Sequence, residues 1–162
     1  SSTAEQVVHV QDAVETITTP EKIVASAVHL LEPDDQLLGV VLNGQAMAYP
    51  ARTVYPHAVV NDTVGGEPIY VVYCEACQTG SVKKRSVGEQ VLTMQSFGGT
   101  LEEDNFRMAD IETGSIWHVV YGEAKSGPLQ GVTLEEVEYE LTDWQSWQAR
   151  YPDSLVLVGA GG

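Results

Sequence analysis

Cys74 and Cys77 are the only cysteines in this 162-residue chain, and two residues separate them. Two thiolates at this spacing can bind one zinc or copper(I) ion, because a short turn presents both sulfur atoms to the same ion. The two thiols can also close a small disulfide ring, which either cycles with the dithiol form or remains a static brace of a tight turn. The pair therefore predicts a thiol site and leaves three kinds of site open.

The metal hypothesis needs further ligands, because a closed zinc site has about four and the chain has no second Cys-x-x-Cys motif. His57 is the first candidate for a third ligand, with Asp62 as a partner that would orient its ring. His118, Met94 and Met108 are weaker candidates. Two thiolates with a histidine or a methionine would suit copper(I) better than a structural zinc.

The redox hypothesis draws on the basic run at residues 83–85, which would lower the pKa of a thiol if it folded back toward the cysteines. Thioredoxin-like proteins place this motif at the start of a helix, whereas Gly80 and the β-rich segment after it predict a turn between strands. We rank metal binding first, a static brace second and redox exchange third.

Polar residues elsewhere could complete a substrate pocket beside the thiols. The pocket candidates are Asn61, Asp62, Asn105, Met108 and Asp110, with Asp62, Asn105 and Asp110 facing the substrate if the protein is an enzyme. For the clusters at 61–66 and 110–115 we favour turns, which Asn, Asp and Gly commonly form. The chain has no nucleophile elbow, phosphate loop or dinucleotide fingerprint, so no particular reaction is indicated.

Composition limits the partners of the protein. The formal net charge is -15, from 8 Lys and Arg against 23 Asp and Glu, which disfavours nucleic acid and anionic lipid. No apolar run approaches the roughly 18 residues that cross a bilayer. The start of the chain lacks a basic flank and an apolar core, so it is not an uncleaved signal peptide. A metal-handling or redox protein is the partner that we expect.

Apolar patterning predicts a mainly β or α+β fold, either a twisted antiparallel sheet or a partly open barrel with short peripheral helices. Thr19-Pro20-Glu21 has the pattern of a helix start, and we expect a helix to Leu31. Thr142 or Asp143 would cap a second helix, in which Trp144 and Trp147 pack on the sheet. Expected strands lie at 37–42 and 45–49 around an Asn43-Gly44 turn, and at 69–73, from 82 to a turn at Gly88, and at 91–97, 115–121, 132–141 and 154–158.

We expect three segments: a polar tail at residues 1–19, one β-rich domain at 20–158 and a flexible tail at 159–162. An ordered set of short motifs runs through the middle segment. The motifs are Leu38-Gly39-Val40, Asn43-Gly44 and Ala48-Tyr49-Pro50; His57, Val60-Asn61-Asp62 and Gly65-Gly66; Tyr73-Cys74, Cys77 and Thr79-Gly80; Asn105, Met108 and Asp110; Thr113, Ser115 and Trp117; Gly122 and Ala124; Gly127-Pro128 and Gly131; and Trp144, Trp147 and Tyr151-Pro152-Asp153.

In this order the motifs resemble the bacterial and archaeal domain-of-unknown-function family 3179, over roughly residues 20–158. The resemblance implies no reaction. Because members of that family often look exported or membrane-anchored, it implies an extracytoplasmic protein, periplasmic or anchored as a lipoprotein. The chain has Glu75-Ala76 where the family usually has proline and leucine.

We therefore expect, first, an extracytoplasmic domain that binds copper or zinc through Cys74, Cys77 and His57. The alternatives are a thiol–disulfide redox protein or metal-dependent enzyme, and a structural or interaction domain with a Cys74–Cys77 disulfide as a brace.

Overall fold

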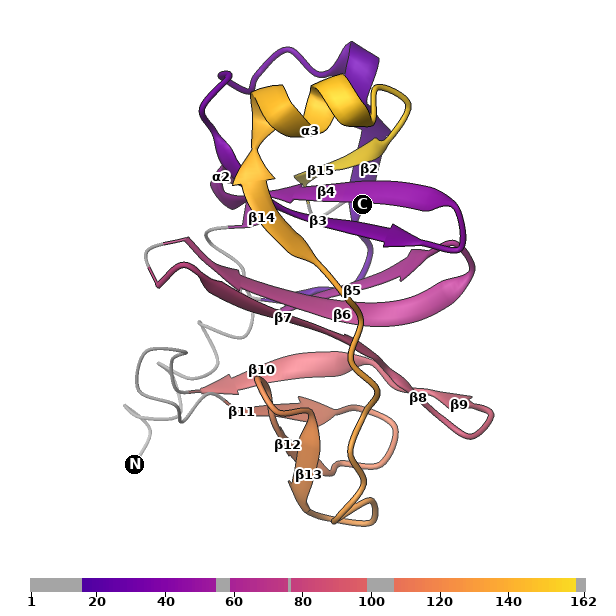
Figure 1. The fold of residues 1–162 in the computed structure, drawn as a ribbon. Helices are drawn as coiled ribbons and strands as arrows, with labels where there is room; N and C mark the ends of the chain where they lie inside the picture. The colour runs from indigo at the N-terminus through magenta and orange to yellow at the C-terminus, as the bar shows by residue number, and fades with distance from the viewer. Residues whose placement is uncertain (1–15, 55–58, 76, 99–106, 160–162) are drawn as a thin grey trace.

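The computed structural model describes residues 16–54, 59–75, 77–98 and 107–159 (Figure 1). Most of these residues form strands, which are arranged in several open sheets. None of the sheets in the described part of the chain closes into a barrel. The prediction of a compact, mainly β fold with short helices is confirmed.

The first layer is a five-stranded sheet. Its order is β14 (Glu140–Asp143), β3 (Gln36–Leu42), β4 (Gln45–Pro50), β15 (Leu155–Gly159) and β2 (Glu21–Val24). The predicted two-residue turn joins β3 to β4, with φ of 49° at Asn43 and 83° at Gly44. Both values lie in the left-handed region that a type I′ turn requires, so this hairpin prediction is confirmed.

The second layer contains β1 (Thr16–Ile17), β5 (Val59–Val64), β6 (Glu67–Cys74) and β7 (Thr79–Lys84) in that order. The short strand β1 falls within the segment that we expected to be a polar tail, and it pairs in parallel with the start of β5. Its Ile17 side chain is buried in the core. Residues 16 and 17 therefore pack with the main body of the protein.

The third layer is an antiparallel sheet beside a small hairpin. It contains β10 (Met94–Gly98), β11 (Arg107–Asp110), β12 (Ile116–His118) and β13 (Glu123–Ser126), and the hairpin pairs β8 (Ser86–Val87) with β9 (Gln90–Val91). In Figure 1 this sheet lies on the opposite side of the second layer from the five-stranded sheet.

Strand β6 is apolar from Ile69 to Val72, where both of its faces are buried. Ile69 and Val71 pack against the five-stranded sheet, in a cluster with Leu38 and Met47. Tyr70 and Val72 point the other way, into a cluster that includes Met108 and Trp117 of the third layer. Alternate residues of a strand project to opposite faces, so a central layer must be apolar at both sets of positions.

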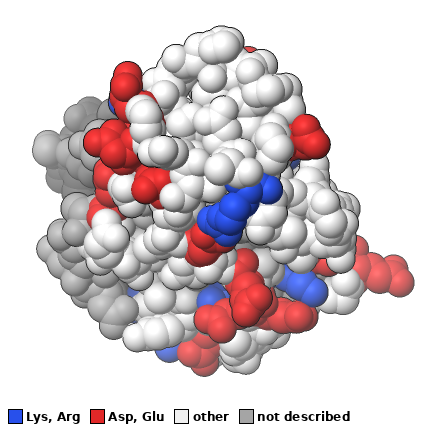
Figure 2. All heavy atoms as spheres, turned by 45° about the horizontal axis from the view of Figure 1, so that its top comes forward, with Lys and Arg blue, Asp and Glu red and all other residues white. Residues whose placement is uncertain are grey.

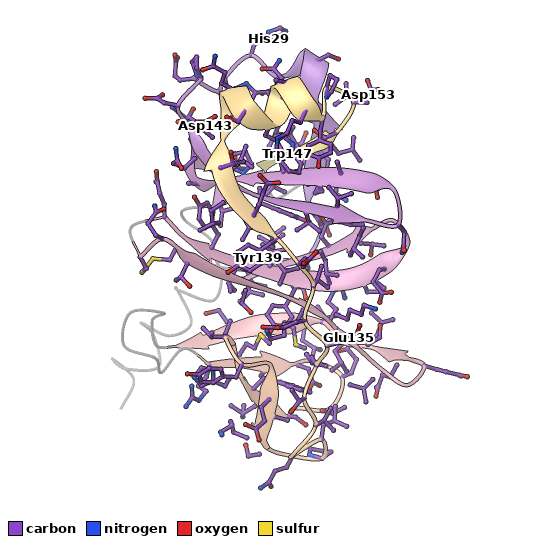
Figure 3. All side chains as sticks on the ribbon, viewed as in Figure 1. His29, Glu135, Tyr139, Asp143, Trp147 and Asp153 are labelled. Atoms are coloured by element: carbon purple, nitrogen blue, oxygen red, sulfur yellow. A yellow bond between two sulfur atoms is a disulfide. The ribbon has the colours of Figure 1, made fainter. Side chains whose placement is uncertain are left out.

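The outer face of the five-stranded sheet is covered by α3 (Trp144–Arg150). The Asp143 carboxylate accepts the Ser146 N–H at 2.8 Å, so Asp143 is the helix N-cap. Trp144 and Trp147 are buried against the sheet, and Figure 3 shows Trp147 between helix and sheet. The predicted capped helix and its packing face are confirmed. A shorter helix, α2 (Ala51–Val54), follows β4.

The predicted helix at 20–31 is wrong. Residues 21–24 form β2, and Ala25–Ala27 form a single turn of 3₁₀-helix. Ile23 pairs with Val156 of β15, and Val24 pairs with Leu155. The β-branched pair at 23–24 favours a strand, and hydrogen bonding to β15 outweighs the local cap signal at Thr19-Pro20.

Two predicted strands are shorter than expected. Only Ile116–His118 of the 115–121 segment is a strand, because a turn with a Gly122 N–H to His118 C=O hydrogen bond follows it. Within 132–141, the described pairing before β14 is limited to isolated bridges at Thr133 and Glu136. Leu134 and Val137 are buried while the glutamates face solvent, but a spacing of three residues is not the alternation of a strand, and no long strand forms here.

Candidate functional site

Cys74 and Cys77 form a disulfide at one end of the β6–β7 hairpin. Cys74 is the last residue of β6, and it pairs with Thr79, the first residue of β7. The two cysteine Cα atoms are 5.3 Å apart, and both residues are half-buried. The disulfide is the yellow bond at the left end of this hairpin in Figure 3. The motif therefore lies in a turn between strands, as the sequence predicts.

Hydrogen bonds within the turn hold the disulfide. The Gln78 N–H donates to the Glu75 carbonyl at 3.1 Å, and the Gln78 side-chain amide donates to the same oxygen at 2.8 Å. Gln78 has a φ of 53°, the left-handed conformation that returns the chain to β7. The Cys77 N–H donates to the Cys74 Sγ at 3.1 Å. A donor aimed at this sulfur would stabilise a Cys74 thiolate if the disulfide were reduced.

The charged residue between the two cysteines is an acid. Glu75 lies between the two cysteines and is exposed. Burial, and secondly the Glu75 carboxylate, raise the pKa of Tyr73 to about 12. An anion in this position disfavours thiolates, because like charges repel.

The prediction that the basic run at residues 83–85 would lower the pKa of a thiol is wrong. Lys83 pairs with Glu136 at 3.3 Å, and the Arg85 guanidinium donates to three backbone carbonyls, of Asp62, Ile69 and Leu92. Lys83 also lies four residues along β7 from Thr79, about 13 Å at the usual rise of a strand. The direction of β7 carries these cations away from the thiols.

The predicted metal site gains no support from the described residues. His57 and Asn105 lie outside them. Within the described ranges, no group of three or more His, Cys, Asp and Glu side chains is placed to hold an ion. Met94 and Met108 are buried in the cluster between the second and third layers. His118 stacks on Tyr121, with ring centroids 4.3 Å apart. Copper or zinc binding by Cys74 and Cys77 stays a prediction.

Asn61 is buried and links three strands. Its amide donates to the carbonyls of Ile17 and Met94 at 3.0 and 2.9 Å, and its Oδ1 accepts the Met94 N–H at 2.8 Å. These contacts tie β5 to β1 and β10. Both the NH₂ group and the oxygen of the Asn61 amide are therefore hydrogen-bonded within the protein.

Asp62 forms a buried ionic cluster. Its Oδ2 accepts the Tyr49 hydroxyl at 2.7 Å, and its Oδ1 lies 2.5 Å from Lys22 Nζ and accepts the Thr63 N–H. Burial, then the negative charge of Asp62, raises the pKa of Tyr49 well above its ordinary value. Asp62 pairs with Ile69, five residues before Cys74 on β6, so it lies far along the hairpin from the disulfide.

Asp110 closes a turn, which was the interpretation that we favoured. Its carboxylate accepts the Thr113 N–H and hydroxyl, at 2.5 and 2.9 Å, and the Trp117 indole N–H at 2.8 Å. Met108, its neighbour on β11, is fully buried. Neither residue borders the hollow described next. Their role in a substrate pocket stays a prediction.

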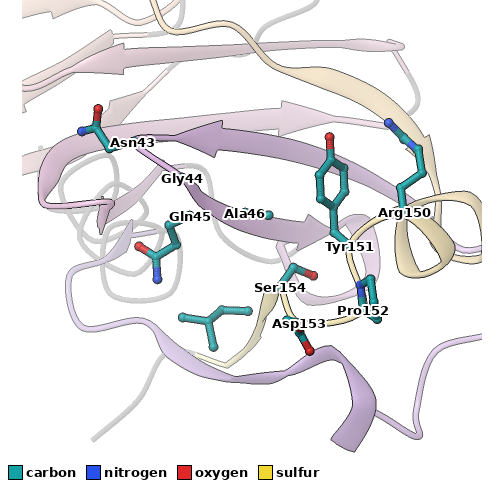
Figure 4. Close-up of a pocket in the computed structure, with 10 residues that line it drawn as sticks. Asn43, Gly44, Gln45, Ala46, Arg150, Tyr151, Pro152, Asp153 and Ser154 are labelled. Atoms are coloured by element: carbon teal, nitrogen blue, oxygen red, sulfur yellow. The ribbon is translucent and has the colours of Figure 1, made fainter.

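Sequence analysis missed a surface hollow of about 420 Å³ at the far side of the five-stranded sheet (Figure 4). The β3–β4 turn with the start of β4, residues 43–46, forms one side. The end of α3 and the loop to β15, residues 150–155, form the other. Both segments contain motifs named in the sequence analysis. They are about a hundred residues apart in the chain, and only the tertiary structure brings them together.

Among the charged side chains on the visible surface, acids outnumber bases (Figure 2). Figure 2 shows Asp and Glu in several groups on the face that carries α3, with few Lys and Arg between them. Several cations that are present are engaged by acids, such as Arg150 with Glu140 and Lys84 with Glu135. No helix in the described part of the chain is both long and apolar enough to cross a membrane.

Comparison with known proteins places the chain in one family. It matches, over residues 11–162, the family described as "Protein of unknown function (DUF3179)". No curated protein and no solved structure matches it.

Proposed function

This chain belongs to the DUF3179 family, whose description assigns no activity, and we propose from its own residues that it is a thiol–disulfide exchange protein. The observation that carries the proposal is the half-buried Cys74–Cys77 disulfide, with the Cys77 N–H directed at the Cys74 sulfur. The substrate class is a protein with two reactive thiols.

The exchange has two steps. A thiolate of the partner attacks the Cys77 sulfur, the S–S bond breaks, and its electron pair remains on Cys74, where the Cys77 N–H stabilises it. The second thiolate of the partner then attacks the partner sulfur that is bonded to Cys77, and Cys77 is released as a thiolate. The partner is oxidised to a disulfide, Cys74 and Cys77 are reduced, and the two protons lost by the partner thiols balance those gained. The reverse sequence oxidises this protein and reduces a partner.

A purely structural brace is the weaker alternative. A disulfide stabilises mainly by restricting the unfolded chain, and a loop as short as this one gives only about 2 kcal/mol. The strands that it joins are already paired from Ile69↔Lys84 to Cys74↔Thr79. The sulfur atoms also lie at the end of a hairpin, where a partner can reach them, and not in a core.

The same proposal includes an extracytoplasmic location, since disulfides persist in oxidising compartments and are rare in the reducing cytosol. The proposal also includes metal binding by the reduced form of the protein. Once reduced, the two thiolates are soft ligands for copper(I) or zinc, and the Cys77 N–H would stabilise a bound Cys74 thiolate as it does a free one.

The proposal is tested by equilibrating the folded protein with dithiothreitol redox buffers and counting alkylated thiols by mass spectrometry. We expect both cysteines to change together as one two-electron couple, while circular dichroism stays native. The variants Cys74→Ser and Cys77→Ser each leave one thiol, and we expect the lower thiol pKa for Cys74 because residue 77 keeps its N–H. A disulfide that is reduced only as the protein unfolds would establish the brace instead. Elemental analysis of the reduced protein with copper(I) or zinc checks the metal binding.

A further inference from the structure

The hollow of about 420 Å³ arises from the register of two parallel strands. Strand β15 begins at Leu155, which pairs with Met47, the third residue of β4. Gln45 and Ala46 therefore extend beyond the start of β15, and no strand of the described chain pairs with them on that side. The loop that precedes β15 turns away from β4 here, so a groove opens between them.

Polar groups in the groove have hydrogen-bonding capacity left over. Ser154 is only 4% exposed, and its hydroxyl accepts the Trp147 indole N–H at 3.0 Å, which leaves its own hydrogen to donate. Gln45 uses its Oε1 to accept the Gly65 N–H, which leaves the Nε2 amide group. Asp153 presents an exposed carboxylate that makes no hydrogen bond or ion pair with the residues that the structure describes. Figure 4 shows these three side chains around the hollow.

An aromatic ring forms the remaining wall. The Tyr151 ring packs on Trp147, with centroids 4.4 Å apart. The Arg150 guanidinium lies 5.3 Å from the Tyr151 ring, and Glu140 neutralises it through two hydrogen bonds. Tyr151 is thus held in place, and the cation at the rim is already paired.

We propose that this groove binds a neutral polyhydroxylated ligand, a sugar ring at the end of a glycan. Each sugar hydroxyl both donates and accepts, which suits donors at Ser154 and Gln45 beside an acceptor at Asp153. Tyr151 offers an apolar wall for the C–H face of the ring. The volume is within the usual range of ligand sites, and the open mouth leaves room for a longer chain.

The charges and hydrogen-bond donors around the groove favour a neutral ligand over an anionic or a cationic one. An anionic ligand would meet the Asp153 carboxylate and a protein of net charge -15, and Arg150 is taken up by Glu140. A cationic ligand would have the Asp153 carboxylate and the net charge in its favour, but it would leave the donors at Gln45 Nε2 and the Ser154 hydroxyl without an acceptor, which the hydroxyls of a sugar supply. The site lies in the first layer and does not depend on the disulfide in the second.

The test is a titration by ¹⁵N NMR with three probes: methyl α-glucopyranoside, methyl β-galactopyranoside and N-acetylglucosamine. We expect saturable shifts from at least one of them, concentrated in the amides of residues 43–46, 151 and 153–155. Asp153→Asn removes the carboxylate, and Gln45→Glu removes the free N–H₂ while keeping the acceptor for Gly65. Each should weaken binding at least fivefold.

Glu89→Gln, in the turn of the β8–β9 hairpin in the third layer, is the matched charge control and should bind as the parent protein does. The proposal is overturned by the absence of a saturable shift with all three sugars, or by shifts that lie elsewhere. It is also overturned by equal affinity in the parent, Asp153→Asn and Gln45→Glu proteins, or by binding of inorganic phosphate or ethylamine in place of the sugars.

Discussion

The indole of Trp147 lies directly over Gly39, so that a Cβ on Gly39 would be 2.2 Å from Cζ3 of the ring. This contact joins the helix α3 to the middle of the five-stranded sheet. It explains why a strand with leucine and valine on either side has a glycine at this position.

We expect Gly39→Ala to destabilise the protein by about 1–3 kcal/mol, because a buried indole cannot move aside without disturbing the packing of α3. The measurement is urea denaturation followed by tryptophan fluorescence. Gly159→Ala is the control, since the nearest neighbour of its Cβ is the end of the flexible Glu21 side chain at 3.3 Å. It should change stability by less than about 0.5 kcal/mol. Equal stability of Gly39→Ala and the parent would contradict the packing described here.

The hydrogen bond from Tyr49 to Asp62 should be worth more than an exposed one. Both side chains are buried, and Tyr49→Phe leaves the carboxylate with one donor fewer, at a cost of about 1.5–3 kcal/mol. Tyr139→Phe is the matched control, because the Tyr139 hydroxyl donates to the Gly80 carbonyl at an exposed position. Its cost should not exceed about 1 kcal/mol. Equal losses in thermal or urea unfolding would show that burial of the cluster has no energetic effect.

Alkaline pH should unfold the protein through its buried phenols. Burial raises the pKa values of Tyr49 and Tyr70 well above the ordinary value of about 10, and that of Tyr73 to about 12. The folded state therefore keeps these protons where the unfolded state loses them. Their contribution to stability is complete below pH 10 and is lost progressively above it, for Tyr73 between pH 10 and about 12.

Absorbance at 295 nm, recorded alongside circular dichroism, checks this expectation. Three of the seven tyrosines should ionise only as the structure melts, or above pH 11. Ionisation of all seven by pH 11 with an unchanged dichroism spectrum would contradict it. Chemical unfolding at pH 7, 9 and 11 should give similar free energies at the first two values and a lower one at the third.

The charge between the cysteines should tune the redox couple. Replacing Glu75 by Gln removes an anion that disfavours both thiolates, so the reduced form gains stability and the reduction potential rises, by about 10–20 mV. Glu75→Lys should raise it further. Glu138→Gln, an exposed glutamate outside the turn, is the control. A potential that is the same in all four proteins would show that Glu75 does not affect the sulfur atoms.

Sequence alone determined the features that depend on neighbours in the chain. Asn43-Gly44 formed its turn because positive φ is available to both residues. Asp143 capped α3 by reaching an N–H three residues away. The two cysteines met because a turn of two intervening residues brings their Cα atoms to 5.3 Å, and β6 was recognised by an apolar run. Each interaction spans only a few residues, so its partners are visible in one stretch of sequence.

Tertiary structure decided the features that depend on distant partners. The 20–31 segment carried a helix start, yet pairing with β15, about 130 residues later, made it a strand. The basic run at 83–85 turned from the thiols to Glu136 and to carbonyls of other strands. The groove needs Gln45 beside Ser154, and the register of β4 with β15 brings them together. Hydrogen bonds and packing across layers outweigh local propensity, and one stretch of sequence does not identify which strand will supply them.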